Sequence, residues 1–247
     1  MPDVVGFRAK MGVIIPSTNT VVEADFWDMR IPGVTFHTGR IYIGQPALDS
    51  DRAMEQLLQQ VDKSIETALR DVMTCQPDYL LMGMSAPTFW GGIEGNRRFV
   101  ERVRSLTGLK IVTGADACRA ALEAVKAKRI TVFTPYQPIM REQIVKFFEE
   151  CGFQVVRYKD LHSPSATAIA QITPAELRPV LHEMDGPDID AIVQCGTNLS
   201  MVRLAADAEG WLGKPVIAIN MATLWHGYRA NGITDKLYGF GSLLSDY

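Results

Sequence analysis

The sequence predicts an α/β fold made of two similar halves, each with a parallel sheet, that face each other across a cleft. Short β-branched runs alternate with amphipathic stretches along the whole chain of 247 residues, and this alternation is typical of parallel sheets with right-handed crossovers. Three motifs of the first half also return in the same order in the second half. Loops rich in small polar residues follow the strands, and open parallel sheets bind ligands beyond the carboxyl ends of their strands.

The expected strands are short and apolar, whereas the expected helices carry apolar residues three and four positions apart. One helix is expected over residues 53–75, where Leu57, Val61 and Ile65 share a face, and another over residues 138–151. In chain order, the expected strands are Val13–Ile15, Tyr79–Met82, Ile111–Val112, Ile130–Phe133, Ile189–Val193 and Val216–Ile219.

The repeated motifs indicate an internal duplication. GVIIPSTNT resembles TVFTPYQP, DYLLMGMSAPT resembles DAIVQCGTNLS, and LKIVTGADACRAALEAV resembles KPVIAINMATLWHGYRA, at a single offset of roughly 110–120 residues. Any α/β chain contains some segments that resemble each other, but three similar pairs in the same order and at one offset favour duplication. We expect Val13–Ile15 to be equivalent to Thr131–Phe133, and Leu80–Met82 to Ile192–Gln194.

The duplication also predicts how the chain divides. Residues 1–118 together with 221–247 are expected to form the first domain, and residues 119–220 the second. The last helix, from Met221, is expected to cross back and pack on the first unit.

Composition excludes several classes of function. The net charge of −3 and the scattered basic residues do not provide the basic face that nucleic-acid binding needs. No apolar run approaches the ~20 residues of a membrane helix, and the N-terminus lacks the pattern of a signal peptide. We therefore expect a cytoplasmic protein with reduced thiols.

The sequence shows no motif for a metal or nucleotide cofactor. The four cysteines show no metal-ligand spacing, so no metal is expected. The segment GGIEG at Gly91–Gly95 does not fit a nucleotide-binding fingerprint.

Four loops are expected to meet in the cleft, and their N–H groups together with the helix N-termini behind them favour an anion. These loops are Pro16–Thr20, Gly83–Thr88, Pro135–Pro138 and Cys195–Ser200.

At these loops the sequence resembles the aspartate/glutamate racemase superfamily, and more narrowly the branch of maleate cis-trans isomerases and arylmalonate decarboxylases. IIPSTNT, LLMGMS, FTPYQP and VQCGTNLS carry the resemblance, which covers nearly the whole chain. It implies two pseudo-symmetric domains with a substrate carboxylate between them, and no metal, pyridoxal phosphate or nucleotide.

Racemases of this superfamily place one cysteine on each half, and Cys195 matches the second of them. The first falls at Gly83, or at Ser85 in a shifted alignment, so the first thiol is absent. Two-base racemisation needs an acid and a base on opposite faces. Arylmalonate decarboxylases likewise have glycine at the first position, whereas maleate isomerases usually keep both cysteines. Asn19, in contrast, resembles the isomerases.

The resemblance and the residue types together suggest a substrate-binding set. Asn19 is expected to contact the carboxylate or to cap a helix, and Tyr136 to donate its hydroxyl. Ser85 offers a hydroxyl and an N–H. The remaining candidates are Ser17, Gly83, Met84, Gly196 and Thr197, of which Met84, Gly196 and Thr197 offer backbone N–H groups.

Several other residues have a structural or a functional interpretation. Phe89 and Trp90 are expected either to form an apolar wall of the site or to belong to the core. The other three cysteines are expected to pack in the core or lie at the surface without a role in catalysis; they are Cys75, Cys118 and Cys151.

The predicted activity is decarboxylation of a substituted malonate-type dicarboxylate, through an enediolate that Cys195 protonates. Alternatives are a maleate-type cis-trans isomerase that uses Cys195 as its nucleophile, a racemase, and a non-catalytic carboxylate-binding protein. Gly83→Cys is expected to supply the missing thiol. The substrate, the stereochemistry and a possible homo-oligomer stay open.

Overall fold

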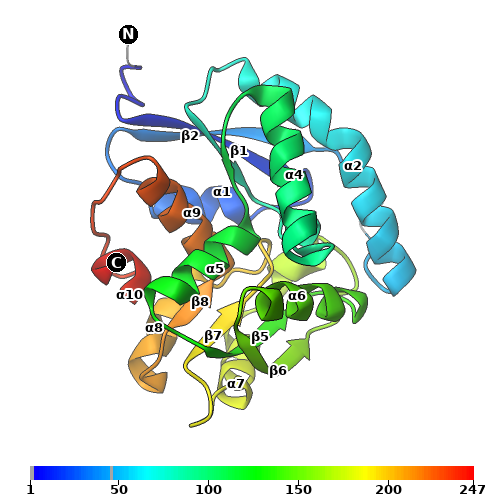
Figure 1. Ribbon diagram of the computed structural model, residues 1–247, viewed down its shortest axis with the longest axis vertical. Helices are drawn as coiled ribbons and strands as arrows, with labels where there is room; N and C mark the ends of the chain where they lie inside the picture. The colour runs from blue at the N-terminus through cyan, green and yellow to red at the C-terminus, as the bar shows by residue number, and fades with distance from the viewer. Residues whose placement is uncertain (1–2, 45–46) are drawn as a thin grey trace.

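Two four-stranded parallel sheets with the same strand order form the framework of the protein (Figure 1). The computed structural model describes residues 3–44 and 47–247. The first sheet has the order β2-β1-β3-β4, from Ala9–Pro16 (β1), Val34–Ile41 (β2), Tyr79–Met82 (β3) and Ile111–Val112 (β4). The second has the order β6-β5-β7-β8, from Arg129–Thr134 (β5), Gln154–Asp160 (β6), Ala191–Gln194 (β7) and Val216–Ala218 (β8). The predicted fold class is confirmed.

The duplicated strands are equivalent as expected, but the register of the first pair differs by one residue. Ile14 pairs with Met82 in the way that Phe133 pairs with Gln194, so Ile14 rather than Ile15 is the counterpart of Phe133. Both strands are buried along nearly their whole length. Strands buried on both faces lack the polar alternation that would otherwise fix a register.

Helices cover both sheets in chain order. Those of the first half are Val22–Asp28 (α1), Asp51–Met73 (α2), Ala86–Phe89 (α3), Gly92–Thr107 (α4) and Gly114–Ala124 (α5). Those of the second half are Ile139–Glu150 (α6), the 3₁₀ turn Ala168–Gln171, Pro174–Met184 (α7), Val202–Leu212 (α8), Ile219–Ala230 (α9) and Ser242–Asp246 (α10). The two helices expected at residues 53–75 and 138–151 correspond to α2 and α6.

Local sequence explains where several helices begin. The Ser50 side chain accepts a hydrogen bond from the Ala53 N–H at the start of α2. Thr173 and Glu176 form a reciprocal capping box at the start of α7, which satisfies two N–H groups that the helix itself cannot bond.

The halves are joined by α5 and α9, which lie side by side between the two sheets (Figure 1). Helix α9 follows the second sheet yet packs on α1 and β3, and the Tyr228 hydroxyl donates to the Met29 carbonyl oxygen at 2.9 Å. Helix α5 follows the first sheet yet contacts β8. The expected crossing of the last long helix is thus observed. The domain division remains a prediction, and its boundary at residue 118 falls inside α5.

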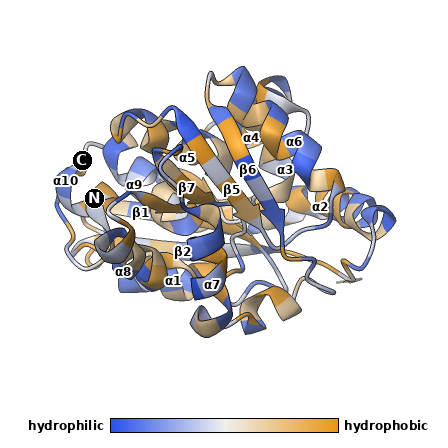
Figure 2. Cartoon of the chain, turned by 90° about the horizontal axis from the view of Figure 1, so that it is seen from below, coloured by the Kyte–Doolittle hydropathy of each residue, from blue (hydrophilic) through white to orange (hydrophobic). Residues whose placement is uncertain are grey.

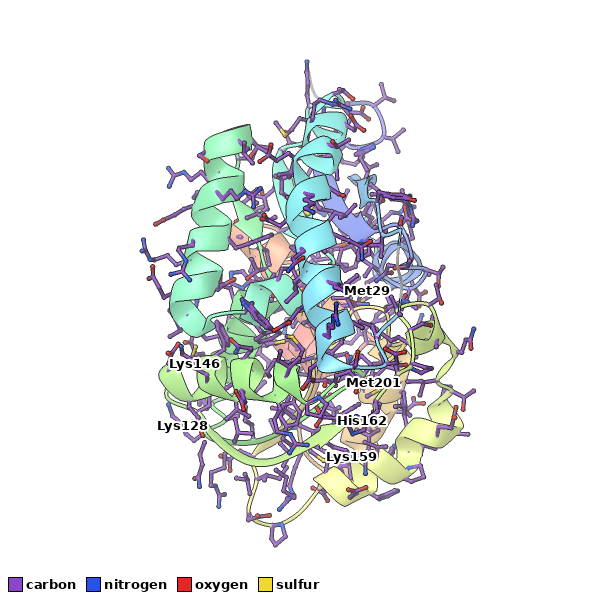
Figure 3. All side chains as sticks on the ribbon, turned by 90° about the vertical axis from the view of Figure 1, so that its right-hand side faces the viewer. Met29, Lys128, Lys146, Lys159, His162 and Met201 are labelled. Atoms are coloured by element: carbon purple, nitrogen blue, oxygen red, sulfur yellow. The ribbon has the colours of Figure 1, made fainter. Side chains whose placement is uncertain are left out.

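Apolar residues gather on the strands and on the inner faces of the helices (Figure 2). Met29 and Met201 are buried, whereas Lys128 and Lys146 lie at the surface (Figure 3). Among the helices of the described residues, none is long and apolar enough to cross a bilayer.

Candidate active site

The four predicted loops meet at a small cavity of about 30 Å³ between the halves. The first half lines it with Pro16, Thr18, Asn19, Leu48, Leu57 and Met84, and the second with Tyr136, Ala166, Ile169, Thr197 and Asn198. This volume is far below the roughly 300–1,000 Å³ of a typical ligand pocket, so the lining must move to admit a dicarboxylate.

A hydroxyl pair crosses from one half to the other beside this cavity. Ser85 Oγ and Tyr136 Oη are 2.5 Å apart, and both residues are buried. Burial raises the pKa of Tyr136 to about 12, although its bond to Ser85 opposes the shift. Tyr136 is therefore protonated at neutral pH and can donate a hydrogen bond to an oxyanion.

Backbone N–H groups are arranged alike at the ends of β3 and β7, the equivalent strands of the two halves. The Gly83 N–H donates to the Ile14 carbonyl oxygen at 2.8 Å, and the Cys195 N–H to that of Phe133 at 3.0 Å. These are the last ladder bonds of β3 and β7. The next two N–H groups on each side, those of Met84, Ser85, Gly196 and Thr197, have no acceptor within the part of the chain that the structure describes. Buried N–H groups normally have a partner, so these four are suited to an anion.

Cys195 begins the second-half loop and is fully buried. Burial is the main cause that raises the pKa of its thiol well above the ordinary value of 9.0, and an interaction with Cys118 adds to it. The thiol is therefore protonated at neutral pH, which suits a proton donor better than a nucleophile. Cys195 itself does not line the small cavity; Thr197, two residues on, does.

Cys118 is buried in the core, as expected, but it is more than packing material, because its side chain lies near enough to that of Cys195 to help raise the pKa of that thiol. Cys118 lies on α5, the first-half helix that crosses to the second sheet. This proximity depends on the crossing and leaves no mark in the local sequence.

Asn19 caps a helix, as one of its two predicted roles requires, and it also lines the cavity. Its Oδ1 accepts hydrogen bonds from the Val21 and Val22 N–H groups at 3.0 Å each, which caps the start of α1. Its Nδ2 points to Thr197 Oγ1 at 3.5 Å, and the residue lines the cavity.

The structure does not bring Ser17 to the site. Ser17 is exposed, and its hydroxyl accepts a hydrogen bond from the Ile43 N–H at 3.0 Å. The neighbouring Thr18 lines the cavity instead.

Of the two roles expected for Phe89, wall of the site or part of the core, the structure shows the second. Phe89 packs in the core, with its ring centroid 5.2 Å from that of Phe147. Leu48 contributes to the wall because its N–H donates to the Pro164 carbonyl oxygen at 2.9 Å, which carries this first-half segment over the second half.

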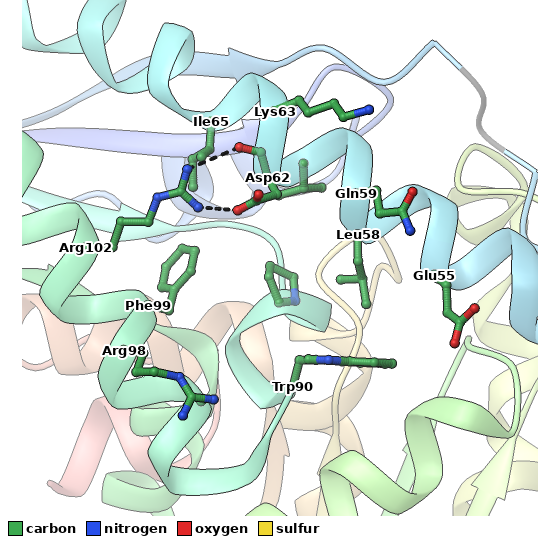
Figure 4. Close-up of a pocket in the computed structure, with 13 residues that line it drawn as sticks. Glu55, Leu58, Gln59, Asp62, Lys63, Ile65, Trp90, Arg98, Phe99 and Arg102 are labelled. Carbon is green, nitrogen blue, oxygen red and sulfur yellow. Dashed lines mark hydrogen bonds and ion pairs between the residues drawn. The ribbon is translucent and has the colours of Figure 1, made fainter.

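A larger groove of about 700 Å³ lies elsewhere, between α2 and α4 (Figure 4). Leu58, Trp90 and Phe99 line it, and Arg102 closes one side through ion pairs with Asp62 and Glu66. None of the predicted site residues lines this groove, so its size does not make it the active site. Trp90 belongs here and not to the cavity between the halves.

Gly83 has no room for a side chain. A Cβ atom at this position would overlap Ile15 Cγ2 and lie 3.0 Å from Val22 Cγ1. The place of a first-half thiol is thus filled by apolar side chains of β1 and α1.

From this geometry we expect Gly83→Cys alone to destabilise the fold without producing racemase activity, in contrast to the expectation from sequence. Overpacking of this kind costs about 1–3 kcal/mol. The measurement is thermal unfolding of Gly83→Cys beside Gly83→Ala and the double variant Ile15→Ala/Gly83→Cys. The double variant should recover stability relative to Gly83→Cys; a single variant as stable as the parent would contradict the steric argument.

Across residues 3–44 and 47–247, no group of three or more His, Cys, Asp or Glu side chains could hold a metal ion. The site offers hydroxyls, one thiol and backbone N–H groups. This arrangement can bind a carboxylate and stabilise negative charge that develops on it.

Fold and site together define an α/β enzyme of the aspartate/glutamate racemase-like superfamily. The family model described as arylmalonate decarboxylase matches residues 11–244, so the chain belongs to this family. It is similar to a maleate isomerase of Pseudomonas putida strain KT2440, with 27% identity over 96% of this chain and 97% of the relative.

Two solved structures share the fold. One is a cysteine-to-serine variant of the Nocardia farcinica maleate cis-trans isomerase with a covalently bound succinylcysteine intermediate (TM-score 0.86, 21% identity, 96% of this chain and 98% of that one). The other is arylmalonate decarboxylase (TM-score 0.77, 21% identity, 95% and 98%).

Proposed function

We propose that the protein decarboxylates a substituted malonate-type dicarboxylate, with Cys195 as the acid that protonates the resulting carbanion. The observation that carries this proposal is that the loop after β7 begins with the buried thiol of Cys195, whereas apolar side chains fill the space at Gly83 after β3. One acid on one face is sufficient for protonation after loss of CO₂, and racemisation needs two.

The chemistry follows from the donors at the site. The bond from the α-carbon to one carboxylate breaks, CO₂ leaves, and the electron pair enters the remaining carboxylate to give an enediolate. Hydroxyls of Ser85 and Tyr136 and the four unpaired N–H groups stabilise this charge. The Cys195 S–H then transfers its proton to the α-carbon, and solvent returns a proton to the thiolate.

A maleate-type isomerase is the second candidate, favoured by the 27% identity to a maleate isomerase. In that reaction the Cys195 thiolate would add to the double bond and leave after rotation. The raised pKa of Cys195 argues against it, because little thiolate is present at neutral pH. A carboxylate-binding protein without turnover is the non-enzymatic alternative.

A direct assay separates these functions. Purified protein is incubated with phenylmalonate, with maleate and with enantiopure 2-phenylpropionate, while CO₂, fumarate and optical rotation are followed. CO₂ release from phenylmalonate alone is expected. Fumarate formation without CO₂ release would reject the decarboxylase in favour of the isomerase, and binding without turnover would favour the carrier.

Alkylation of Cys195 by iodoacetamide is expected to accelerate continuously with pH and not to level off below pH 9. The thiolate is the reactive species, and burial raises the pKa of this thiol. Peptide mass spectrometry after timed labelling gives the rate, and urea-unfolded protein serves as the control with an ordinary thiol. A plateau below pH 8 in the folded protein would show a lowered pKa and support nucleophilic chemistry.

A further inference from the structure

The loop after Cys195 is tied to the first helix through a buried amide. Asn220, in the first turn of α9, is 3% exposed. Its Nδ2 donates to the Thr197 carbonyl oxygen at 2.9 Å and to Asp25 Oδ2 on α1 at 2.7 Å. An amide nitrogen has two N–H donors, so both are used here.

Two further hydrogen bonds hold the same loop from the start of α1. Asn19 Nδ2 donates to Thr197 Oγ1 at 3.5 Å, and the Thr20 N–H donates to Asn198 Oδ1 at 3.0 Å. Thr197 is thus held at its carbonyl and at its hydroxyl. Because α1 belongs to the first half and the loop to the second, these bonds set how the donors of the two halves face each other.

Asp25 is a partly buried carboxyl that the proposed reaction does not use. It does not line the cavity, and burial raises its pKa to about 6. Asp28, one turn further along α1, also raises it, whereas the hydrogen bond from Asn220 and the charge of Arg203 on α8 lower it. Arg203 itself pairs with Asp28 at 2.7 Å.

We propose that Asp25 and Asn220 are positioning residues, which hold the Thr197 carbonyl so that the Gly196 and Thr197 N–H groups face the substrate carboxylate. The inference rests on the proposed function for the identity of that anion. A carboxylate accepts a stronger hydrogen bond than a neutral acid does. The charged form of Asp25 therefore fixes Asn220 more firmly, and with it the loop.

The variants are Asp25→Asn, Asp25→Ala and Asn220→Ala, with Asp28→Asn as the matched control on the same helix. Turnover of phenylmalonate is measured from pH 5 to 8. Misplaced donors typically cost up to about 10²-fold in rate, so kcat/KM should fall by roughly 10- to 100-fold in Asp25→Ala and Asn220→Ala. In the parent it should fall severalfold as the pH drops through 6, and in Asp28→Asn the same fall should come at a lower pH, because the charge of Asp28 raises the pKa of Asp25. Asp25→Asn should stay at the low level throughout.

Hydrogen–deuterium exchange over residues 195–198 tests the same idea without turnover. Exchange should accelerate in Asp25→Ala and Asn220→Ala but not in Asp28→Asn. If the parent releases no CO₂ and the exchange still accelerates, the decarboxylase proposal fails and the positioning role stands. Unchanged exchange in the variants would overturn the positioning role. A pH profile of the parent that is flat between pH 5 and 7 would also overturn it, and this second measurement does not require any variant to fold.

Discussion

Cys195→Ala is expected to lower kcat for decarboxylation by about 10³-fold or more, while the affinity for the substrate changes little. Removal of a general acid costs about 10²–10⁴-fold, and Cys195 is the only thiol of the two loops that end β3 and β7. The hydroxyls and N–H groups that bind the carboxylate remain in place. Steady-state kinetics on phenylmalonate give kcat, and calorimetric titration of the inactive variant with the same compound gives the affinity.

Cys195→Ser sharpens this result, because a serine hydroxyl has nearly the same shape but is a far weaker acid than a thiol. Its activity should be close to that of Cys195→Ala. Cys75→Ser, on a thiol that donates to the Val72 carbonyl oxygen of its own helix end, is the control and should keep full activity. Full activity of Cys195→Ala would reject the mechanism and leave the fold assignment intact.

The parts of the fold that could be read from the sequence are those that depend on local pattern. Alternating strand and helix periodicity predicted two parallel sheets, although the expected strands did not include β2 and β6. The loops after β1, β3, β5 and β7 meet at one cavity, as their composition predicted. The exact register of β1 could not be read, since a fully apolar strand such as Ala9–Pro16 looks the same when shifted by one residue.

What the sequence did not reveal depends on contacts between distant segments. Cys118 reaches Cys195 only because α5 crosses to the second sheet. Leu48 covers the cavity only because its segment bonds to Pro164. Ser17 and Thr18 are adjacent, and which of them faces the cavity is decided by the bond of Ser17 to Ile43. No periodicity encodes such pairings, so these assignments required the structure.

Tyr136→Phe is expected to lower kcat by about 10²–10³-fold, the usual cost of one lost oxyanion donor. The ring and its packing are kept, so only the hydroxyl is removed. Ser85→Ala should have a comparable effect, because the two hydroxyls are 2.5 Å apart and act on the same charge. Groups that act as one unit are not additive, so the double variant should lose much less than the product of the two single losses.

Tyr158→Phe is the matched control for this prediction. The Tyr158 hydroxyl, like that of Tyr136, forms a hydrogen bond with another hydroxyl, in this case Thr134 Oγ1 at 3.2 Å. Tyr158 does not line the cavity. This variant should keep kcat within a few-fold of the parent. If Tyr136→Phe and Tyr158→Phe lost activity equally, the loss would reflect general packing of β5 and β6, and the Ser85–Tyr136 pair would have no special part in stabilising the enediolate. A large loss confined to Tyr136→Phe and Ser85→Ala, with kcat lowered and KM nearly unchanged, is the result that places the developing charge between the two halves, where these hydroxyls meet.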